Sequence, residues 1–334
     1  ILETSLTDDN RQIFLTTSEQ SHNVEYTVSV VRGVFDRTAL KRGVAQNQSA
    51  KFRAGWRFLV ISDWHSAEKY VFPERKGRPE DIARDVEIVK YLKTTFGGDF
   101  ILMAGDTNAG TWDRTDFKNA LATDMGKENL TKEEAVLEAG RRCYGGMMSS
   151  FRHGGYSQVL LAHGDHEAGD NPWKVGENKS ILQPQFRQAM GDVFNSDRNG
   201  YKRYRDNIGD ASARPTNTQF SDTAYAYVHK NTLIVTVDAF YQVNADTEIS
   251  HLGTVANRIV EGQLDWLRNV LEQARLNSEI QFKVVQSHVP VLHPVRKNRS
   301  SGQMMELEEN SDFWKTLREF EVDIYFTGEV HLNT

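Results

Sequence analysis

Five short apolar runs, each ended by a polar motif, constrain the fold of this 334-residue chain more than any other feature. The runs are RFLVIS (57–62), FILMA (100–104), QVLLA (158–162), FKVVQ (282–286) and VDIYFT (322–327). Their β-branched and aromatic residues are typical of buried strands. The motifs that follow are Asp63-Trp64-His65, Gly105-Asp106-Thr107-Asn108, Gly164-Asp165-His166-Glu167, Ser287-His288-Val289-Pro290 and Gly328-Glu329-Val330-His331. Functional groups of an α/β sheet collect beyond the carboxyl ends of its strands, so we expect these side chains to converge on one site. Such a set suits metal ions better than a single nucleophile.

The segments between these runs predict helices and a second sheet. Apolar residues spaced by three or four predict a helix over 79–96, a capping-box pattern at 131–134 opens one near 132–142, and a third is expected near 255–275. Two adjacent runs, 224–228 and 232–238, predict a hairpin in a second sheet. Strands and helices that alternate from about residue 57 onward indicate an α/β fold.

The first 55 residues differ from the rest, because they alternate in polarity and contain few helix signals. We expect 1–55 to form an N-terminal extension with extra β-strands and 56–334 to form the main domain. Two stretches, near 109–156 and 168–222, are predicted to be insertions that serve as binding loops or lids. Since the sequence begins with Ile1 and stops soon after a candidate ligand, we also expect further residues at both ends and additional domains in the full-length protein.

Composition excludes several classes of protein. No apolar stretch is long enough to span a bilayer as a helix, and the net charge of −6 argues against a nonspecific nucleic-acid binder. The lone Cys143 can form neither an internal disulfide nor a cysteine metal site. Few cysteines and the missing start methionine favour a secreted or periplasmic location, with the cytoplasm as the alternative.

In this order, the five motifs resemble those of the calcineurin-like metallophosphoesterase family, over roughly residues 57–331. The resemblance implies two packed mixed β-sheets flanked by helices, a four-layer αββα sandwich of the α/β class. It also implies two metal ions at the shared edge of the sheets. The implied activity is hydrolysis of a phosphodiester or phosphomonoester in a small phosphorylated substrate, with metal-bound hydroxide as the nucleophile.

The resemblance also assigns a role to each motif residue. One metal would be held by Asp63, His65 and His331, a second by Asp165, His288 and Glu329, and Asp106 would bridge the two. His166 would contact the substrate and stabilise charge or protonate the leaving oxygen. Glu167 would orient His166 from outside the metal ligands, and His293 would line the pocket. Asn108 would either bind substrate or stabilise a turn, and Trp112 would be either a pocket wall or a core residue. His163 is expected to point away from the metals.

Two positions depart from the family pattern, because Asp165 stands where asparagine is usual and Glu329 where histidine is usual. Four carboxylates would then cancel the charge of two divalent cations. We expect this to favour singly charged diesters and harder cations, Mn²⁺ and/or Fe, with Mg²⁺, Ca²⁺ or Zn²⁺ as alternatives. Other interpretations are a site that uses one ion, a nuclease or nucleotide phosphodiesterase on the same fold, and a non-catalytic binding protein with an altered metal site.

Overall fold

The computed structural model describes residues 56–169, 178–194, 206–244, 256–292 and 304–329, and the backbone of four strands that precede them. The chain divides into two compact units, Ile1–Arg57 and Phe58–Thr334. In the first unit, β1 (Glu3–Leu6) pairs with β2 (Ile13–Thr16) and β3 (Glu25–Val30) pairs with β4 (Gln48–Arg53), both antiparallel. The assignment of this unit as an extension to a main domain stays a prediction.

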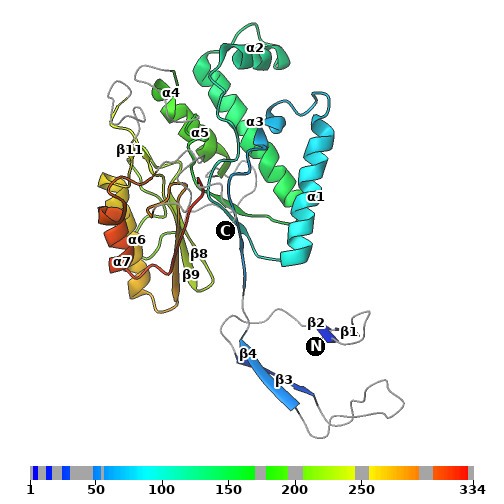
Figure 1. Cartoon of the computed structure of the whole chain (residues 1–334), viewed down its shortest axis with the longest axis vertical. Coiled ribbons are helices and arrows are strands. Elements are labelled where there is room, and N and C mark those ends of the chain that lie inside the picture. Colours follow the sequence, from blue (N-terminus) through cyan, green and yellow to red (C-terminus); the bar gives the residue numbers. More distant parts are fainter. Residues whose placement is uncertain are drawn as a thin grey trace. The chain divides into compact units, whose positions relative to one another are not determined.

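The second unit contains two main sheets (Figure 1). The first is parallel, in the order β5 (Leu59–Ile61), β6 (Ile101–Met103) and β7 (Val159–Leu161). The second is mixed and runs β13 (Ile324–Phe326), β12 (Phe282–Gln286), β9 (Thr232–Thr236) and β8 (Tyr225–His229). In it β8 is antiparallel to β9, so the predicted hairpin is confirmed, and β12 is parallel to both its neighbours. All five apolar runs therefore form strands, as predicted.

Hydrogen bonds tie the two sheets together at their facing surfaces. The Gln286 amide on β12 donates to the carbonyl of Leu160 on β7 at 2.9 Å. The Tyr225 hydroxyl on β8 donates to the carbonyl of Leu161 at 2.8 Å. Because the strand ends of both sheets are held in this way, the loops that leave them occupy one shared edge.

Helices cover the outer faces of both sheets. They are α1 (Arg78–Phe96), α2 (Thr115–Asp124), α3 (Lys132–His153), α4 (Asn178–Ile181), α5 (Gln183–Phe194), α6 (Glu261–Leu276) and α7 (Asp312–Glu319). Short elements between them are the 3₁₀ helices η1 (Ala67–Val71) and η3 (Glu308–Asn310) and the paired strands β10 (Phe240–Tyr241) and β11 (Ala256–Asn257). In Figure 1, α6 and α7 lie at the left beside the second sheet, while α1 and α3 lie at the right. The predicted mixed-sheet sandwich with flanking helices is confirmed.

The three predicted helices are present, but α3 is longer than predicted, and α6 begins at Glu261 instead of near residue 255 because 256–257 form β11. The capping box at the start of α3 forms as expected, since Thr131 Oγ1 accepts from the Glu134 amide and the Glu134 carboxylate accepts from the Thr131 amide. The helix then continues to His153 because residues such as Cys143 and Phe151 keep its buried face apolar.

Much of the stretch near 109–156 packs into the protein interior instead of forming an open loop. Its helix α3 lies against η1, α1 and α5, and belongs to the apolar core beside the first sheet. Trp112, from the same stretch, is fully buried and stacks on Phe186 of α5 at 5.8 Å between ring centroids. Trp112 is therefore a core residue, and the pocket-wall interpretation is wrong. Whether this stretch is an insertion stays a prediction.

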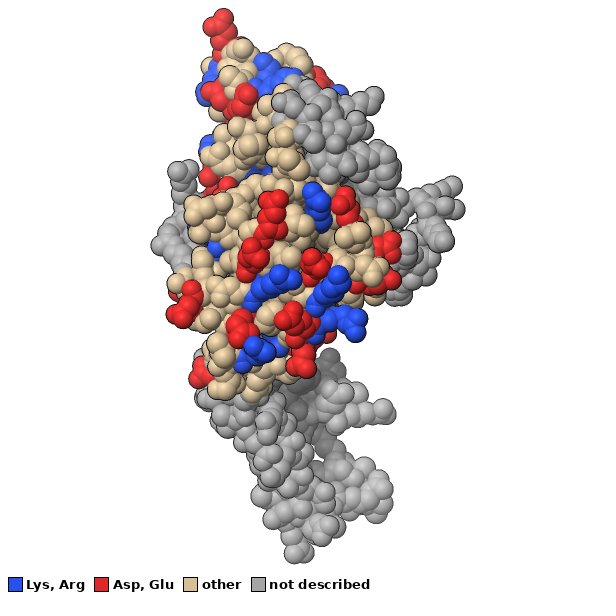
Figure 2. Space-filling view, turned by 90° about the vertical axis from the view of Figure 1, so that its left-hand side faces the viewer, with Lys and Arg blue, Asp and Glu red and all other residues tan. Residues whose placement is uncertain are grey.

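The surface over α6 and α7 carries charges of both signs. Figure 2 shows Lys and Arg side chains interleaved there with Asp and Glu side chains. Arg275 pairs with Glu272 on α6, and Lys315 pairs with Asp312 on α7. Neither sign forms a broad field on this face. None of the described helices is both long enough and apolar enough to cross a bilayer.

Candidate metal centre

The predicted ligands lie just beyond the carboxyl ends of five strands, where the sequence places them. Asp63 follows β5, Asp106 follows β6, Asp165 follows β7, His288 follows β12 and Glu329 follows β13. The structure gathers them into two groups that share Asp106. His331 and His293 lie outside the described residues, and their roles stay predictions.

The first group is buried and consists of Asp106, Asp165, His288 and Glu329. The Nε2 atom of His288 lies 3.3 Å from Asp106 Oδ2, 3.2 Å from Asp165 Oδ1 and 3.0 Å from Glu329 Oε2. On the other side of the ring, Nδ1 donates to the carbonyl oxygen of Ala104 at 2.7 Å. This hydrogen bond fixes the ring orientation, so that Nε2 faces the three carboxylates.

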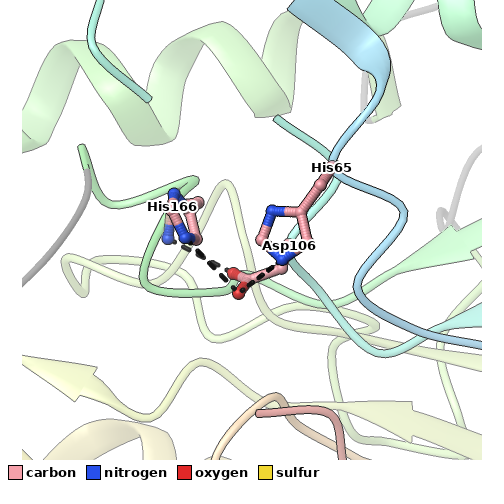
Figure 3. A group of neighbouring side chains, drawn as sticks. All are labelled: His65, Asp106 and His166. Atoms are coloured by element: carbon pink, nitrogen blue, oxygen red, sulfur yellow. Dashed lines mark hydrogen bonds and ion pairs between the residues drawn. The ribbon is translucent and has the colours of Figure 1, made fainter. Parts of the chain in front are cut away.

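The second group is partly exposed and consists of His65, Asp106 and His166, with Asp63 beside them. The Nε2 atoms of His65 and His166 lie 3.8 and 3.9 Å from Asp106 Oδ2, and His65 Nε2 lies 4.0 Å from Asp63 Oδ1. Figure 3 shows the two imidazoles reaching the Asp106 carboxylate from different sides. Their rings meet edge to face, with centroids 4.8 Å apart.

The backbone around the ligands is tightly packed, and three glycines make this possible. A Cβ atom at Gly105 would lie 2.6 Å from His288 Nδ1, and one at Gly328 would lie 2.6 Å from the same nitrogen. A Cβ atom at Gly164 would overlap Asp106 Oδ1 and lie 2.7 Å from the Asp106 amide nitrogen. The glycines that precede Asp106, Asp165 and Glu329 in the motifs are therefore needed for close approach of the ligand loops.

Glu167 organises the loop that carries Asp106. Its fully buried carboxylate accepts from the backbone amides of Asp106 at 2.7 Å, Thr107 at 2.8 Å and Gly164 at 3.0 Å. It also accepts from the Thr107 hydroxyl and the Asn108 amide. The sequence led us to expect that Glu167 orients His166. Its hydrogen bonds run instead to this loop, while the Nδ1 atom of His166 lies 3.4 Å from the carbonyl oxygen of Ala109.

Asn108 is fully buried, which disfavours the expected contact with substrate. Its amide nitrogen donates to Glu167, and its oxygen accepts from the amide of Gly110 at 2.8 Å. With these partners inside the protein, Asn108 stabilises the turn after β6, which is the alternative left open by the sequence.

The charges of the centre act strongly on one another. Burial raises the pKa of Asp106 to about 7, although the His288 ring acts against this shift. Burial opposes a positive charge on His288, but Asp106, Asp165 and Glu329 outweigh it and raise the pKa of the ring well above its usual range. Burial likewise opposes a charge on His166, whose pKa is nevertheless raised by Asp106 and Asp165. Without a cation, the centre therefore tends to hold protons.

Glu68 supports the loop that carries Asp106, and the sequence did not single it out for this role. Glu68 accepts from the amide of Ala109 at 2.7 Å and from the Trp112 indole at 3.0 Å, so it braces the far end of the Asp106 loop. Asp238 follows β9 and is fully buried, and despite this burial His163 and Arg187 hold its pKa below its usual range. His163 Nδ1 lies 3.3 Å from Asp238 Oδ2. The ring therefore faces Asp238 and not the metal ligands, which agrees with the expectation from the sequence. A lone glutamate after a motif, such as Glu68, carries no sequence signal that distinguishes this role.

The donor set fits a hard metal cation. The buried group offers one imidazole nitrogen and three carboxylates, a combination that suits Mn²⁺, Fe and Mg²⁺ better than softer ions. Within the part of the chain that the structure describes, the buried Oδ1 atom of Asp165 has the His288 ring nitrogen 3.2 Å away and makes no further hydrogen bond. Buried polar atoms normally have a full set of hydrogen-bond partners, so a buried carboxylate oxygen that lacks them is consistent with a ligand to a cation.

A comparison with known protein families identifies the family of this chain. A family profile described as calcineurin-like phosphoesterase matches residues 57–333. A search of curated proteins finds no match. Among solved structures, a dimetal phosphatase from Danio rerio is 15% identical to this chain. The match covers 83% of this chain and 82% of the phosphatase chain, with a TM-score of 0.44. The structure of PhoD is 11% identical to this chain. That match covers 75% of this chain and 46% of the PhoD chain, with a TM-score of 0.34. By the family match, this chain belongs to the calcineurin-like phosphoesterase family, and metal-dependent phosphoester hydrolysis is the class of activity that this membership supports.

Proposed function

We propose that this protein hydrolyses singly charged phosphodiesters at a centre of two metal ions. The observation that carries this proposal is the presence of four carboxylates, Asp63, Asp106, Asp165 and Glu329, around three imidazoles. Two divalent cations would bring the sum of these charges to zero. A neutral centre attracts a phosphate dianion less than a positive one does, so a monoester gains less from binding here than it would at a site with fewer carboxylates.

The two groups of ligands define two positions for the cations. Asp106, Asp165, His288 and Glu329 would hold one cation, and Asp63, His65, Asp106 and the sequence-predicted ligand His331 the other, with Asp106 shared between them. Cations in such sites neutralise phosphate oxygens and lower the pKa of a nearby water molecule. Asp106 has two carboxylate oxygens, so it can offer one to each cation. Its main chain is held by Glu167, which would fix the two positions relative to each other.

In the proposed reaction, His166 would donate a proton to the leaving group. Its Nδ1 atom faces the carbonyl oxygen of Ala109, which leaves Nε2 directed toward Asp106 and the centre. Burial opposes a charge on the ring, but Asp106 and Asp165 outweigh it and raise its pKa, which favours the protonated form. A positioned acid of this kind stabilises charge that develops on the departing oxygen.

The same carboxylates bear on the identity of the metals. Oxygen-rich sites favour hard cations, so Mn²⁺ and Fe fit better than Zn²⁺, with Mg²⁺ and Ca²⁺ next. The substrate would be a small phosphorylated molecule whose remaining contacts come from outside the ligand set.

The decisive experiment compares p-nitrophenyl phosphate with bis-p-nitrophenyl phosphate, using metal-free protein reconstituted with each cation in turn. We expect turnover that chelation abolishes and Mn²⁺ or Fe restores, with a higher kcat/KM for the diester. The variant Asp106→Asn serves as the inactive control. A strong preference for the monoester would refute the diester proposal. No turnover with any cation would instead favour a binding protein, and cleavage confined to oligonucleotides would favour a nuclease.

A further inference from the structure

The two metal positions differ in burial, spacing and charge. We name Asp106, Asp165, His288 and Glu329 the buried position, and Asp63, His65 and Asp106 the outer position. We infer that the two positions fill in sequence, the buried position first and tightly, and the outer position second and weakly. This inference rests on the proposed two-metal function and adds an order of filling to it.

The spacing of the ligand atoms is the first argument. Nitrogen and oxygen ligands lie about 2.1 Å from ions of this kind, so neighbouring ligands of an octahedral ion are roughly 3.0 Å apart. At the buried position, the separations from His288 Nε2 to the carboxylate oxygens are 3.0, 3.2 and 3.3 Å. At the outer position, the separations from His65 Nε2 are 3.8 and 4.0 Å. The buried ligands are therefore close to the arrangement that a cation needs, whereas the outer ligands must move inward.

The contacts that hold the ligands in place also favour the buried position. His288 is fully buried and held by its hydrogen bond to the Ala104 carbonyl, and Gly105 and Gly328 approach its ring so closely that a Cβ atom at either would lie 2.6 Å from Nδ1. The His65 side chain is 35% exposed and the Asp63 side chain 18% exposed. A ligand that is already fixed loses less conformational entropy when a cation binds, so the buried position gains more affinity from the same bonds.

Charge supplies the third argument. The buried position has three carboxylates and the outer position has two, one of which, Asp106, is shared. Both departures from the usual family residues, Asp165 and Glu329, fall on the buried position, so the extra negative charge is not spread over the centre. Attraction between a cation and these carboxylates is also screened less by solvent where the carboxylates are buried. The first cation then reduces the negative charge that attracts the second.

A metal titration without substrate tests this order. Metal-free protein is titrated with Mn²⁺ by calorimetry, while the electron paramagnetic resonance signal of free Mn²⁺ counts the ions bound. We expect two binding events, the first at least 10-fold tighter than the second. Because phosphoester turnover is not measured, failure of the proposed catalytic function would leave this result unaffected.

Matched variants assign each event to a position. Glu329→Gln, which removes one charge at the buried position, should weaken the first event by roughly 10- to 100-fold. Asp165→Asn keeps the side-chain shape and should act in the same direction, so it replaces Glu329→Gln if that variant does not fold. His65→Gln should weaken the second event and leave the first unchanged. The inference is overturned by two equal events, by saturation at one ion, or by loss of the tight event in His65→Gln.

Discussion

Replacing Glu167 by glutamine tests whether one buried carboxylate holds the loop that carries Asp106. In the native protein, Oε1 accepts from the Thr107 amide, the Thr107 hydroxyl and the Asn108 amide, while Oε2 accepts from the amides of Asp106 and Gly164. A glutamine keeps only one of these oxygens. The less costly orientation keeps the oxygen with three donors and turns the new NH₂ group toward the other two amides.

The size of the effect follows from those two amides. Each buried N–H that loses its acceptor costs about 1–3 kcal/mol, which gives about 2–6 kcal/mol for the pair. Glu167 also repels the neighbouring Asp106 carboxylate, and a neutral glutamine relieves this repulsion. We therefore expect the lower part of the range, about 2–4 kcal/mol, out of a typical domain stability of about 5–15 kcal/mol.

Urea unfolding of the metal-free protein, followed by tryptophan fluorescence, measures this loss. The control is Glu87→Gln on α1, where the exposed side chain pairs with Lys90 and the expected change is below about 0.5 kcal/mol. A loss for Glu167→Gln of less than about 1 kcal/mol would refute the reasoning, because it would mean that the two amides find other partners. Metal affinity should fall together with stability, since the Asp106 main chain loses its anchor.

Three further outcomes are expected. Metal binding should release protons near neutral pH, because the pKa of Asp106 is raised to about 7 and that of His288 is also raised; affinity should therefore increase with pH, and calorimetry in buffers of different ionisation enthalpy counts the protons. His166→Asn should lower kcat by about 10²–10⁴-fold for substrates with poor leaving groups and by less for p-nitrophenol, which a series of aryl esters would show. Arg187→Met should destabilise the protein by about 3–5 kcal/mol, since it leaves Asp238 buried without the guanidinium that lies 3.2 Å away, and the double variant with Asp238→Asn should lose less than the sum of the single losses in urea unfolding.

The arrangement of the centre could be predicted from the sequence to the extent that it depends on strands. Apolar runs predict strands locally, and the ends of neighbouring parallel strands necessarily share an edge, so the meeting of Asp106 with His288 follows from patterns that are visible in the chain. The same logic predicted the β8–β9 hairpin, because both of its runs are short, apolar and close together.

Contacts between residues far apart in the sequence could not be predicted in this way. The burial of Asn108 depends on Glu167, which lies 59 positions further along the chain. The placement of Trp112 in the core depends on α5, which supplies the stacked ring of Phe186. The partners of Glu68 likewise become visible only when η1 is folded against the loop after β6. Local sequence patterns report which residues are polar or apolar, but they do not report which distant group satisfies each one.

The backbone conformation of the ligands indicates why these particular residue types occupy the centre. Asp63, His65, Asp106 and Glu329 have φ angles of 55°, 44°, 58° and 70°, in the left-handed region that glycine adopts without strain. Such a conformation costs of the order of 1–3 kcal/mol at each non-glycine residue, and glycine would remove that cost while removing the ligand. Mutual repulsion of the carboxylates adds to the strain when no cation is bound. The backbone conformation therefore disfavours a non-glycine residue at all four positions. The attraction of the side-chain oxygens and nitrogens for a bound cation would offset this cost. The strained backbone at this edge is therefore explained by the need for metal-binding side chains at these positions. It connects the conformation of the loops to metal binding.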